Sequence, residues 1–175
     1  VGDDELGRLA LKHAREYGID STCIETDPDR PTGPVDVIVD ESGQPDYTIH
    51  EGVAFDAITL DEKRLARIAA TTWDVVYIGT LAQRSTENRD TLTRVLSAVR
   101  RNQVFYDVNL RQTYFTLERI ERSLLASTIV KINDDESDAL SRMLYGDVMP
   151  IEAVARRLLD SYGLEVVIVT RGGEG

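Results

Sequence analysis

Two polar segments of this chain combine residue types that can handle a small polar substrate and a metal-bound phosphate. Residues 105–111 read Phe-Tyr-Asp-Val-Asn-Leu-Arg, and residues 130–136 read Val-Lys-Ile-Asn-Asp-Asp-Glu. Each segment starts as a short apolar run typical of a strand inside a parallel sheet and ends in amides and charges. Ligands of open α/β sheets bind beyond the carboxyl ends of the strands. A lysine, a guanidinium, two amides and a carboxylate at that edge indicate a kinase-like site.

The second segment contains an N-x-x-E pattern formed by Asn133 and Glu136. One reading is structural, because an asparagine at the N-cap with a glutamate at N3 forms a capping box worth about 1 kcal/mol. The other reading is functional. Glu136 and the helix N-terminus would organise the waters of a Mg²⁺ ion and a phosphate, with Asn133 beside them. The two readings are compatible.

The first segment places Asp107, Asn109 and Arg111 just past a predicted strand. If the chain stays extended, alternation puts all three side chains on one side. Asp107 and Arg111 would then form a structural salt bridge. Alternatively, Asn109 and Arg111 contact substrate hydroxyls or a carboxylate, which a planar guanidinium can bind with two hydrogen bonds.

The chain closes with Thr-Arg-Gly-Gly-Glu-Gly at residues 170–175, directly after a predicted strand. Glycines at such a turn allow the backbone to approach a phosphate or an adenine ring. A glycine-rich turn after a strand is also common without a ligand. The segment is neither a Walker A loop nor a dinucleotide G-x-G-x-x-G turn.

The elements that would position these residues alternate between helices and strands. Apolar periodicity and stop signals predict helices at 5–17, 61–70, 85–101, 117–126, 134–145 and from Pro150 to just before Gly163. Apolar runs predict strands at 75–79, 104–107, 129–132 and 166–170. This alternation predicts an α/β fold with a doubly wound, mainly parallel sheet covered on both faces.

Residues 34–50 break the alternation. Valines at 35, 37 and 39 alternate with other residues before a turn-rich stretch, and a second short run ends at His50, which predicts a β-hairpin. Such a hairpin can be a lid, a dimer surface or an ordinary edge hairpin. We therefore divide the chain into an α/β core of residues 1–31 and 53–175 and a β-lid of residues 32–52.

Composition limits the class of protein. The 175 residues carry a formal net charge of −11, which argues against nucleic-acid binding. Hydrophobic residues make up 42% of the chain, yet no apolar run approaches the roughly 18 residues that a membrane span needs. The single cysteine, Cys23, excludes an internal disulfide framework and suits a reducing, cytoplasmic setting.

Six segments together resemble the ribokinase superfamily, the phosphofructokinase B family of carbohydrate kinases, and within it bacterial fructokinases. They occur in the family's order and lie at 2–7, 31–35, 79–84, 107–111, 131–136 and 169–175. The resemblance implies a ribokinase-like core with a β-lid. It also implies Mg²⁺-assisted transfer of the ATP γ-phosphoryl group to a sugar hydroxyl, and leaves a monovalent-cation requirement open.

The resemblance also implies roles for individual residues. Asn133 and Glu136 would lie near the metal and the phosphate and would contact the metal through water. Lys131 belongs to the same nucleotide-side segment. Asn109 and Arg111 face the sugar, and Thr32 and Gly33 belong to the lid that closes over it. The residues on the nucleotide-side turn are Thr170, Gly172 and Gly175. Lids of this family often pair between subunits, so a homodimer through the hairpin is expected.

Two family features are missing from the 175 residues: the first strand with its glycine-rich sugar-binding turn, and the G-A-G-D segment that supplies the general base and anion hole. We therefore expect no catalytic residue within this chain and no activity from the chain alone. The expected function is fructokinase. A kinase for 2-keto-3-deoxygluconate, ribose or a nucleoside stays open, as does a non-catalytic sugar- or nucleotide-binding protein.

Overall fold

The computed structural model describes residues 1–39, 43 and 45–172. The chain forms two compact units, and each is described by itself. The first contains Val1–Leu65 and Ser85–Thr93, and the second contains Ala66–Arg84 and Arg94–Gly175. The division into a core and a lid at residues 32–52 stays a prediction.

The first unit opens with α1 (Glu5–Glu16), which begins where the Asp4 carboxylate accepts the Gly7 N–H at 2.7 Å. The helix ends before Gly18, whose φ of 72° a glycine adopts without strain. A short 3₁₀ turn, η1 (Ser21–Cys23), follows. The predicted helix at 5–17 is thus confirmed to within one residue.

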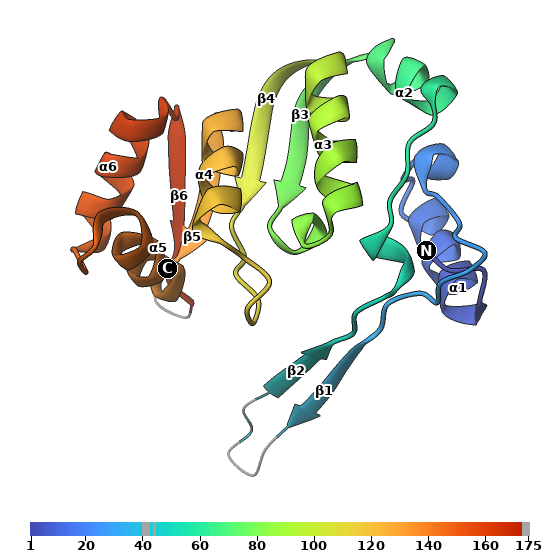
Figure 1. Ribbon diagram of the computed structural model, residues 1–175, viewed down its shortest axis with the longest axis horizontal. Helices are drawn as coiled ribbons and strands as arrows, with labels where there is room; N and C mark the ends of the chain where they lie inside the picture. Colours follow the sequence, from blue (N-terminus) through green and yellow to red (C-terminus); the bar gives the residue numbers. More distant parts are fainter. Residues whose placement is uncertain (40–42, 44, 173–175) are drawn as a thin grey trace. The chain divides into compact units, whose positions relative to one another are not determined.

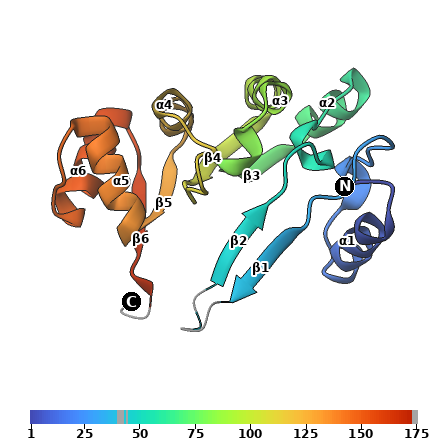
Figure 2. The same cartoon turned by 60° about the horizontal axis from the view of Figure 1, so that its bottom comes forward.

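The predicted hairpin is confirmed as two antiparallel strands, β1 (Val35–Val39) and β2 (Pro45–Ile49), in which Val35 pairs with Ile49 (Figure 2). The turn residues 40–42 and 44 lie outside the described residues. All five residues of β1 are exposed, whereas Ile49 at the base of the hairpin is buried.

A 3₁₀ turn, η2 (Ala54–Asp56), follows the hairpin and is tied to the first part of α3 (Thr86–Ala98) through Asn88. The buried Asn88 amide accepts the Ile58 N–H at 2.7 Å and donates to the Phe55 carbonyl at 2.6 Å. The helix α2 (Glu62–Ala69) then leads into the second unit.

The second unit contains a parallel sheet of β3 (Thr72–Gly79), β4 (Arg100–Asp107), β5 (Ile129–Asn133) and β6 (Val166–Thr170), in that order (Figure 1). The 3₁₀ turn η3 (Leu81–Gln83) follows β3. The crossovers contain α4 (Leu117–Ala126), α5 (Asp134–Tyr145) and α6 (Ile151–Tyr162). Because all four strands are parallel, their carboxyl ends share one edge of the sheet.

The helices cover one face of this sheet. Strand order follows chain order, and right-handed crossovers then place the connecting helices on the same side. Side chains on that face, such as Tyr106 and Ile132, are fully buried. On the other face Tyr77 is 64% exposed and Ile168 is 39% exposed, so the described helices do not provide the predicted cover of both faces.

Three elements, α4, α5 and β6, begin and end at the residues that the sequence predicts. The prediction is wrong between α3 and β4. The helix expected to reach Arg101 ends at Ala98, because Arg100 and Arg101 already pair with Thr72 and Trp73 of β3. Within the part of the chain that the structure describes, no helix is long and apolar enough to cross a membrane.

Candidate active site

The capping box predicted from the N-x-x-E pattern is present at the start of α5. The Asn133 side chain accepts the Glu136 N–H at 2.8 Å, and Glu136 Oε2 accepts the Asn133 N–H at 2.9 Å. Two backbone donors that the helix leaves unsatisfied are thereby paired. The structural reading of this pattern is confirmed, while the metal role stays a prediction.

The second oxygen of Glu136 binds the segment after β4, a contact that the sequence analysis does not predict. Oε1 accepts the Leu110 N–H at 2.8 Å, across 26 residues of sequence, and Glu136 is only 5% exposed. This bond brings the segment after β4 and the start of α5 together, as the topology of neighbouring parallel strands predicts. The segments 109–111 and 133–136 therefore lie next to each other.

The segment after β4 is not extended. Val108 continues the ladder by donating its N–H to the Lys131 carbonyl at 3.1 Å, but Asn109 then adopts φ 38° and Gln112 φ 47°. The assumption that alternation carries Asp107, Asn109 and Arg111 onto one side is therefore wrong. Arg111 lies exposed in this segment.

Three strands contribute to a polar network on the open face of the sheet near its carboxyl edge. Lys131 Nζ lies 3.2 Å from Asp107 Oδ1, and the Tyr77 hydroxyl donates to Asp107 Oδ2 at 2.8 Å. Desolvation and, next, the hydrogen bond to Asp107 raise the pKa of Tyr77. Lys131, predicted on the nucleotide side, thus holds an ion pair with Asp107.

A buried chain of hydroxyls lies beneath the same edge. The Tyr106 hydroxyl is 2.7 Å from the Thr80 hydroxyl, which donates to the carbonyl of Val108. Tyr106 is fully buried, and desolvation raises its pKa to about 12. This chain connects the residue after β3 to the segment after β4.

The turn after β6 is described as far as Gly172. Thr170 is exposed, its hydroxyl lies 3.4 Å from the Ile132 carbonyl, and it pairs with Asn133 in the sheet. Gly172 adopts φ 55°, a conformation that favours glycine. Gly175 lies outside the described residues, so its nucleotide-binding role stays a prediction.

The other predicted substrate residues, Thr32 and Gly33, lie in the first unit. Asp4 Oδ2 accepts the Thr32 N–H and Oδ1 the Thr32 hydroxyl, both at 2.7 Å, while the same hydroxyl accepts the Gly2 N–H at 2.8 Å. A Cβ on Gly33 would lie 2.6 Å from the Phe55 ring, which explains the glycine. Their place over a sugar stays a prediction.

The donor atoms at the start of α5 fit a hydrated Mg²⁺ ion. Asp134, Asp135 and Glu136 supply hard carboxylate oxygens in the first turn. Across residues 1–39, 43 and 45–172, no three or more His, Cys, Asp or Glu side chains form a metal-ligating group. Magnesium sites typically use one or two carboxylates, several waters and substrate phosphates. Since two backbone amides occupy Glu136, contact through water is the arrangement that these residues allow.

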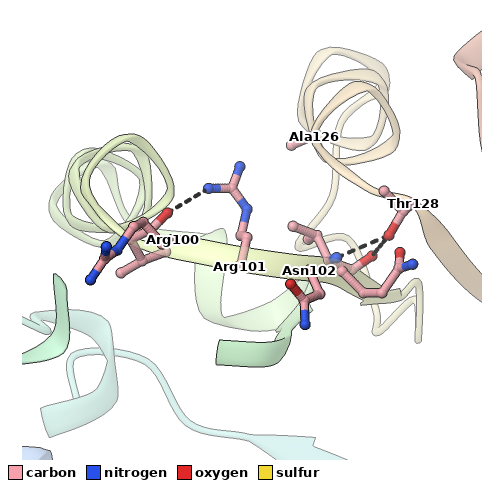
Figure 3. A pocket seen from close by; sticks show the side chains of 8 residues that line it. Arg100, Arg101, Asn102, Ala126 and Thr128 are labelled. Carbon is pink, nitrogen blue, oxygen red and sulfur yellow. Dashed lines mark hydrogen bonds between the residues drawn. The ribbon is translucent and has the colours of Figure 1, made fainter. Parts of the chain in front are cut away.

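A separate hollow of about 460 Å³ lies at the opposite end of β4, against Ala126 at the end of α4 and Thr128 just before β5 (Figure 3). Its arginines have structural partners. Arg101 donates to the Leu96 and Val99 carbonyls at the end of α3, and Arg100 lies 3.4 Å from the Ala70 carbonyl after α2. The hollow is therefore no part of the site described above.

Comparison with known proteins identifies the family. The whole chain, residues 1–175, matches the pfkB family of carbohydrate kinases. The chain belongs to this family. It is 25% identical over 185 aligned residues to a fructokinase of Salmonella typhimurium, covering 100% of this chain and 57% of that protein.

Two solved structures show the same fold. The apo fructokinase of Vibrio cholerae O395 has a TM-score of 0.79 at 20% identity, with 100% of this chain and 60% of that one covered. Aminoimidazole riboside kinase of Salmonella enterica, complexed with aminoimidazole riboside and an ATP analogue, has a TM-score of 0.73 at 20% identity, with 100% and 56% covered. The predicted ribokinase-like α/β fold is confirmed, and this pfkB-family chain spans little more than half the length of these relatives.

Sequence reasoning missed several residues that hold the predicted segments in place within each unit of this pfkB-family chain. Asp4 lies in one of the quoted segments, but its bonds to Thr32 cross 28 residues. Thr80 and Tyr106 are joined across 26 residues. A buried threonine or tyrosine carries no local signal of its partner, whereas Asp4 could have been read as the N-cap of α1 from its spacing to Gly7.

Proposed function

We propose that this chain is part of an ATP-dependent sugar kinase that transfers the γ-phosphoryl group to a hydroxyl of fructose. One observation carries the proposal: the buried Glu136 carboxylate joins the start of α5 to the segment that contains Asn109 and Arg111. The start of α5, to which we assign the nucleotide side, and the segment with Asn109 and Arg111, to which we assign the substrate, are therefore neighbours at the carboxyl ends of the strands. Membership of the pfkB family supports the same reaction class.

Each group at this edge has a chemical use in phosphoryl transfer, a reaction that depends mainly on positioning and charge stabilisation. Arg111 and Asn109 would hydrogen-bond the sugar and orient its hydroxyl. Lys131, Thr170 and Gly172 would lie toward the phosphates, and Lys131 would leave Asp107 to neutralise phosphate charge. Mg²⁺, held through water near Glu136 and Asn133, would supply charge stabilisation on the phosphoryl oxygens.

The lid and the assembly belong to the same proposal. The exposed strand β1 presents Val37 and Ile38, which are 51% and 67% exposed, and would cover either the sugar or a second copy of the hairpin. Closure of the lid, to which Thr32 and Gly33 belong, over the sugar would exclude water as a competing phosphoryl acceptor. Sedimentation of the protein at working concentration tests for the homodimer. A monomeric sedimentation coefficient would contradict it. A cytoplasmic location fits the soluble sugar and ATP as partners.

The decisive experiment is a coupled ADP-release assay on the full-length protein with Mg-ATP. The sugar panel contains fructose, ribose, 2-keto-3-deoxygluconate, adenosine and aminoimidazole riboside, the last because a structural relative was solved with it. We expect turnover on fructose. Turnover on another panel member would correct the substrate, and silence with a folded protein would favour a non-catalytic sugar- or nucleotide-binding role.

The 175-residue polypeptide should be assayed in parallel. Its sequence contains no G-A-G-D run. In the family that the chain resembles, this run supplies the general base and the anion hole. We expect no sugar-dependent ADP formation from it, since loss of both groups removes proton abstraction and charge stabilisation. Turnover by this polypeptide would show that residues within it provide the base.

A further inference from the structure

We propose that Glu136 is a positioning residue that fixes the conformation of the segment 108–112, in addition to any role near a metal ion. The capping box needs only the bond between Glu136 Oε2 and the Asn133 N–H. The bond from Leu110 N–H to Oε1, at 2.8 Å, is not required for capping and crosses 26 residues. Capping alone therefore does not account for this carboxylate.

Burial makes the arrangement specific. Glu136 is 5% exposed, and a buried carboxylate is costly unless donors meet its charge. Here both oxygens accept backbone N–H groups, and the carboxylate lies at the positive end of α5. Hydrogen bonds to a charged acceptor are about twice as strong as neutral ones. We call the hydrogen bond from the Leu110 N–H to Glu136 the clamp. Its acceptor is a charged carboxylate that is buried away from water.

The clamped segment needs such support. Asn109 has φ 38°, in the left-handed region that non-glycine residues enter at a cost. Its two neighbours are both fixed by the β5–α5 part of the chain, since Val108 donates to the Lys131 carbonyl and Leu110 donates to Glu136. The conformation that presents Asn109 and Arg111 is thus set by the nucleotide-side junction. Loss of the Glu136 carboxylate should therefore change the conformation of the segment that contains Arg111.

Amide hydrogen exchange and NMR on the chain test the clamp without any assay of activity. In the unmodified chain, the Leu110 N–H should be protected from exchange, because it is hydrogen-bonded to a buried carboxylate. In Glu136→Gln, the side chain keeps one acceptor oxygen and gains an NH₂ group, so it can hold only one of the two amides. We expect Leu110 exchange to accelerate at least tenfold.

Asp135→Asn is the matched control. It removes the same charge from the same helical turn, and Asp135 is exposed. It should leave Leu110 exchange unchanged. Unchanged Leu110 exchange in a folded Glu136→Gln variant would overturn the clamp, as would exchange of the Leu110 amide at the unprotected rate in the unmodified chain. The exchange rate of Leu110 in the unmodified chain needs no variant, so it tests the clamp even if Glu136→Gln does not fold.

A kinetic arm rests on the proposed function and uses the full-length protein. If Glu136 positions the segment, Glu136→Gln should raise KM for the sugar about tenfold more than KM for Mg-ATP. A change confined to Mg-ATP or to the Mg²⁺ requirement, with Leu110 exchange unaltered, would assign Glu136 to the metal alone and overturn the clamp. Absence of turnover in the unmodified protein would count against the proposed kinase only, because the exchange arm is independent of it.

Discussion

The Asp4 carboxylate holds Thr32 twice, accepting its N–H through Oδ2 and its hydroxyl through Oδ1, both at 2.7 Å. Asp4 also caps α1, so one side chain joins the start of that helix to the Thr32-Gly33 segment.

Replacing Asp4 by Asn should destabilise the first unit in a pH-dependent way. Hydrogen bonds from the Thr32 and Gly7 amides lower the pKa of Asp4 below its ordinary 3.8. A lowered folded-state pKa gives stability that is present above 3.8 and is lost as the pH falls through the folded value. The unfolding midpoint of Asp4→Asn should thus lie below that of the unmodified chain at neutral pH, with the gap closing in acid. Asp3→Asn, which loses only an exposed pairing with Arg8, is the control.

Replacing Thr80 by Val should cost about 2 kcal/mol of unfolding free energy, because the Thr80 hydroxyl both meets Tyr106 and donates to Val108 in a buried setting. Tyr106→Phe should cost about 1 kcal/mol, since Thr80 keeps its bond to Val108. Urea unfolding of both variants and of the double variant measures the coupling. Additive costs would show that the two hydroxyls do not support one another.

Alkaline titration should show Tyr106 ionising late. Desolvation raises its pKa to about 12, so its folded form binds the proton beyond the range where unfolded tyrosine releases it near 10. Its contribution to stability is complete below pH 10 and falls as the pH rises toward 12. The tyrosinate absorbance lost in Tyr106→Phe should therefore belong to the latest part of the titration. An ordinary titration of that tyrosine would contradict its burial.

Replacing Asn109 by Ala should cost about 1 kcal/mol, because asparagine tolerates the left-handed backbone at φ 38° better than alanine does. Asn109→Gly removes the same amide but suits this backbone, so its loss of stability should be smaller. Comparing the two separates backbone strain from the side chain. In the full-length protein, a similar drop in sugar affinity for both variants would indicate that the amide itself contacts the substrate.

Replacing Gly33 by Ala should destabilise the first unit by about 1 to 3 kcal/mol through overpacking, since the new Cβ would lie 2.7 Å from a Val53 methyl and 2.6 Å from the Phe55 ring. Gly79→Ala is the comparison, because its nearest neighbour would be the Asp107 carbonyl at 3.8 Å. Thermal unfolding of the two variants gives the difference. Equal midpoints would mean that the Phe55 ring yields without cost.

Local signals in the sequence were sufficient for several elements. The bounds of α5 were predicted because its cap and its stop, Asn133 before the helix and Gly146 after it, act within a few residues. The capping box of Asn133 and Glu136 is of the same kind. The hairpin at 34–50 was predicted because alternation and turn residues are also local.

Tertiary structure decided everything that depends on partners far apart in the chain. The end of α3 was set by pairing of Arg100 with Thr72 in the neighbouring strand, which overrode the helical period. Lys131 became the partner of Asp107 through strand register. The left-handed turn at Asn109 and the bond from Leu110 to Glu136 depend on a loop and a helix 26 residues apart. The sequence by itself determined the residue types at the sheet edge, but only folding brought their backbone amides within hydrogen-bond distance of one buried carboxylate.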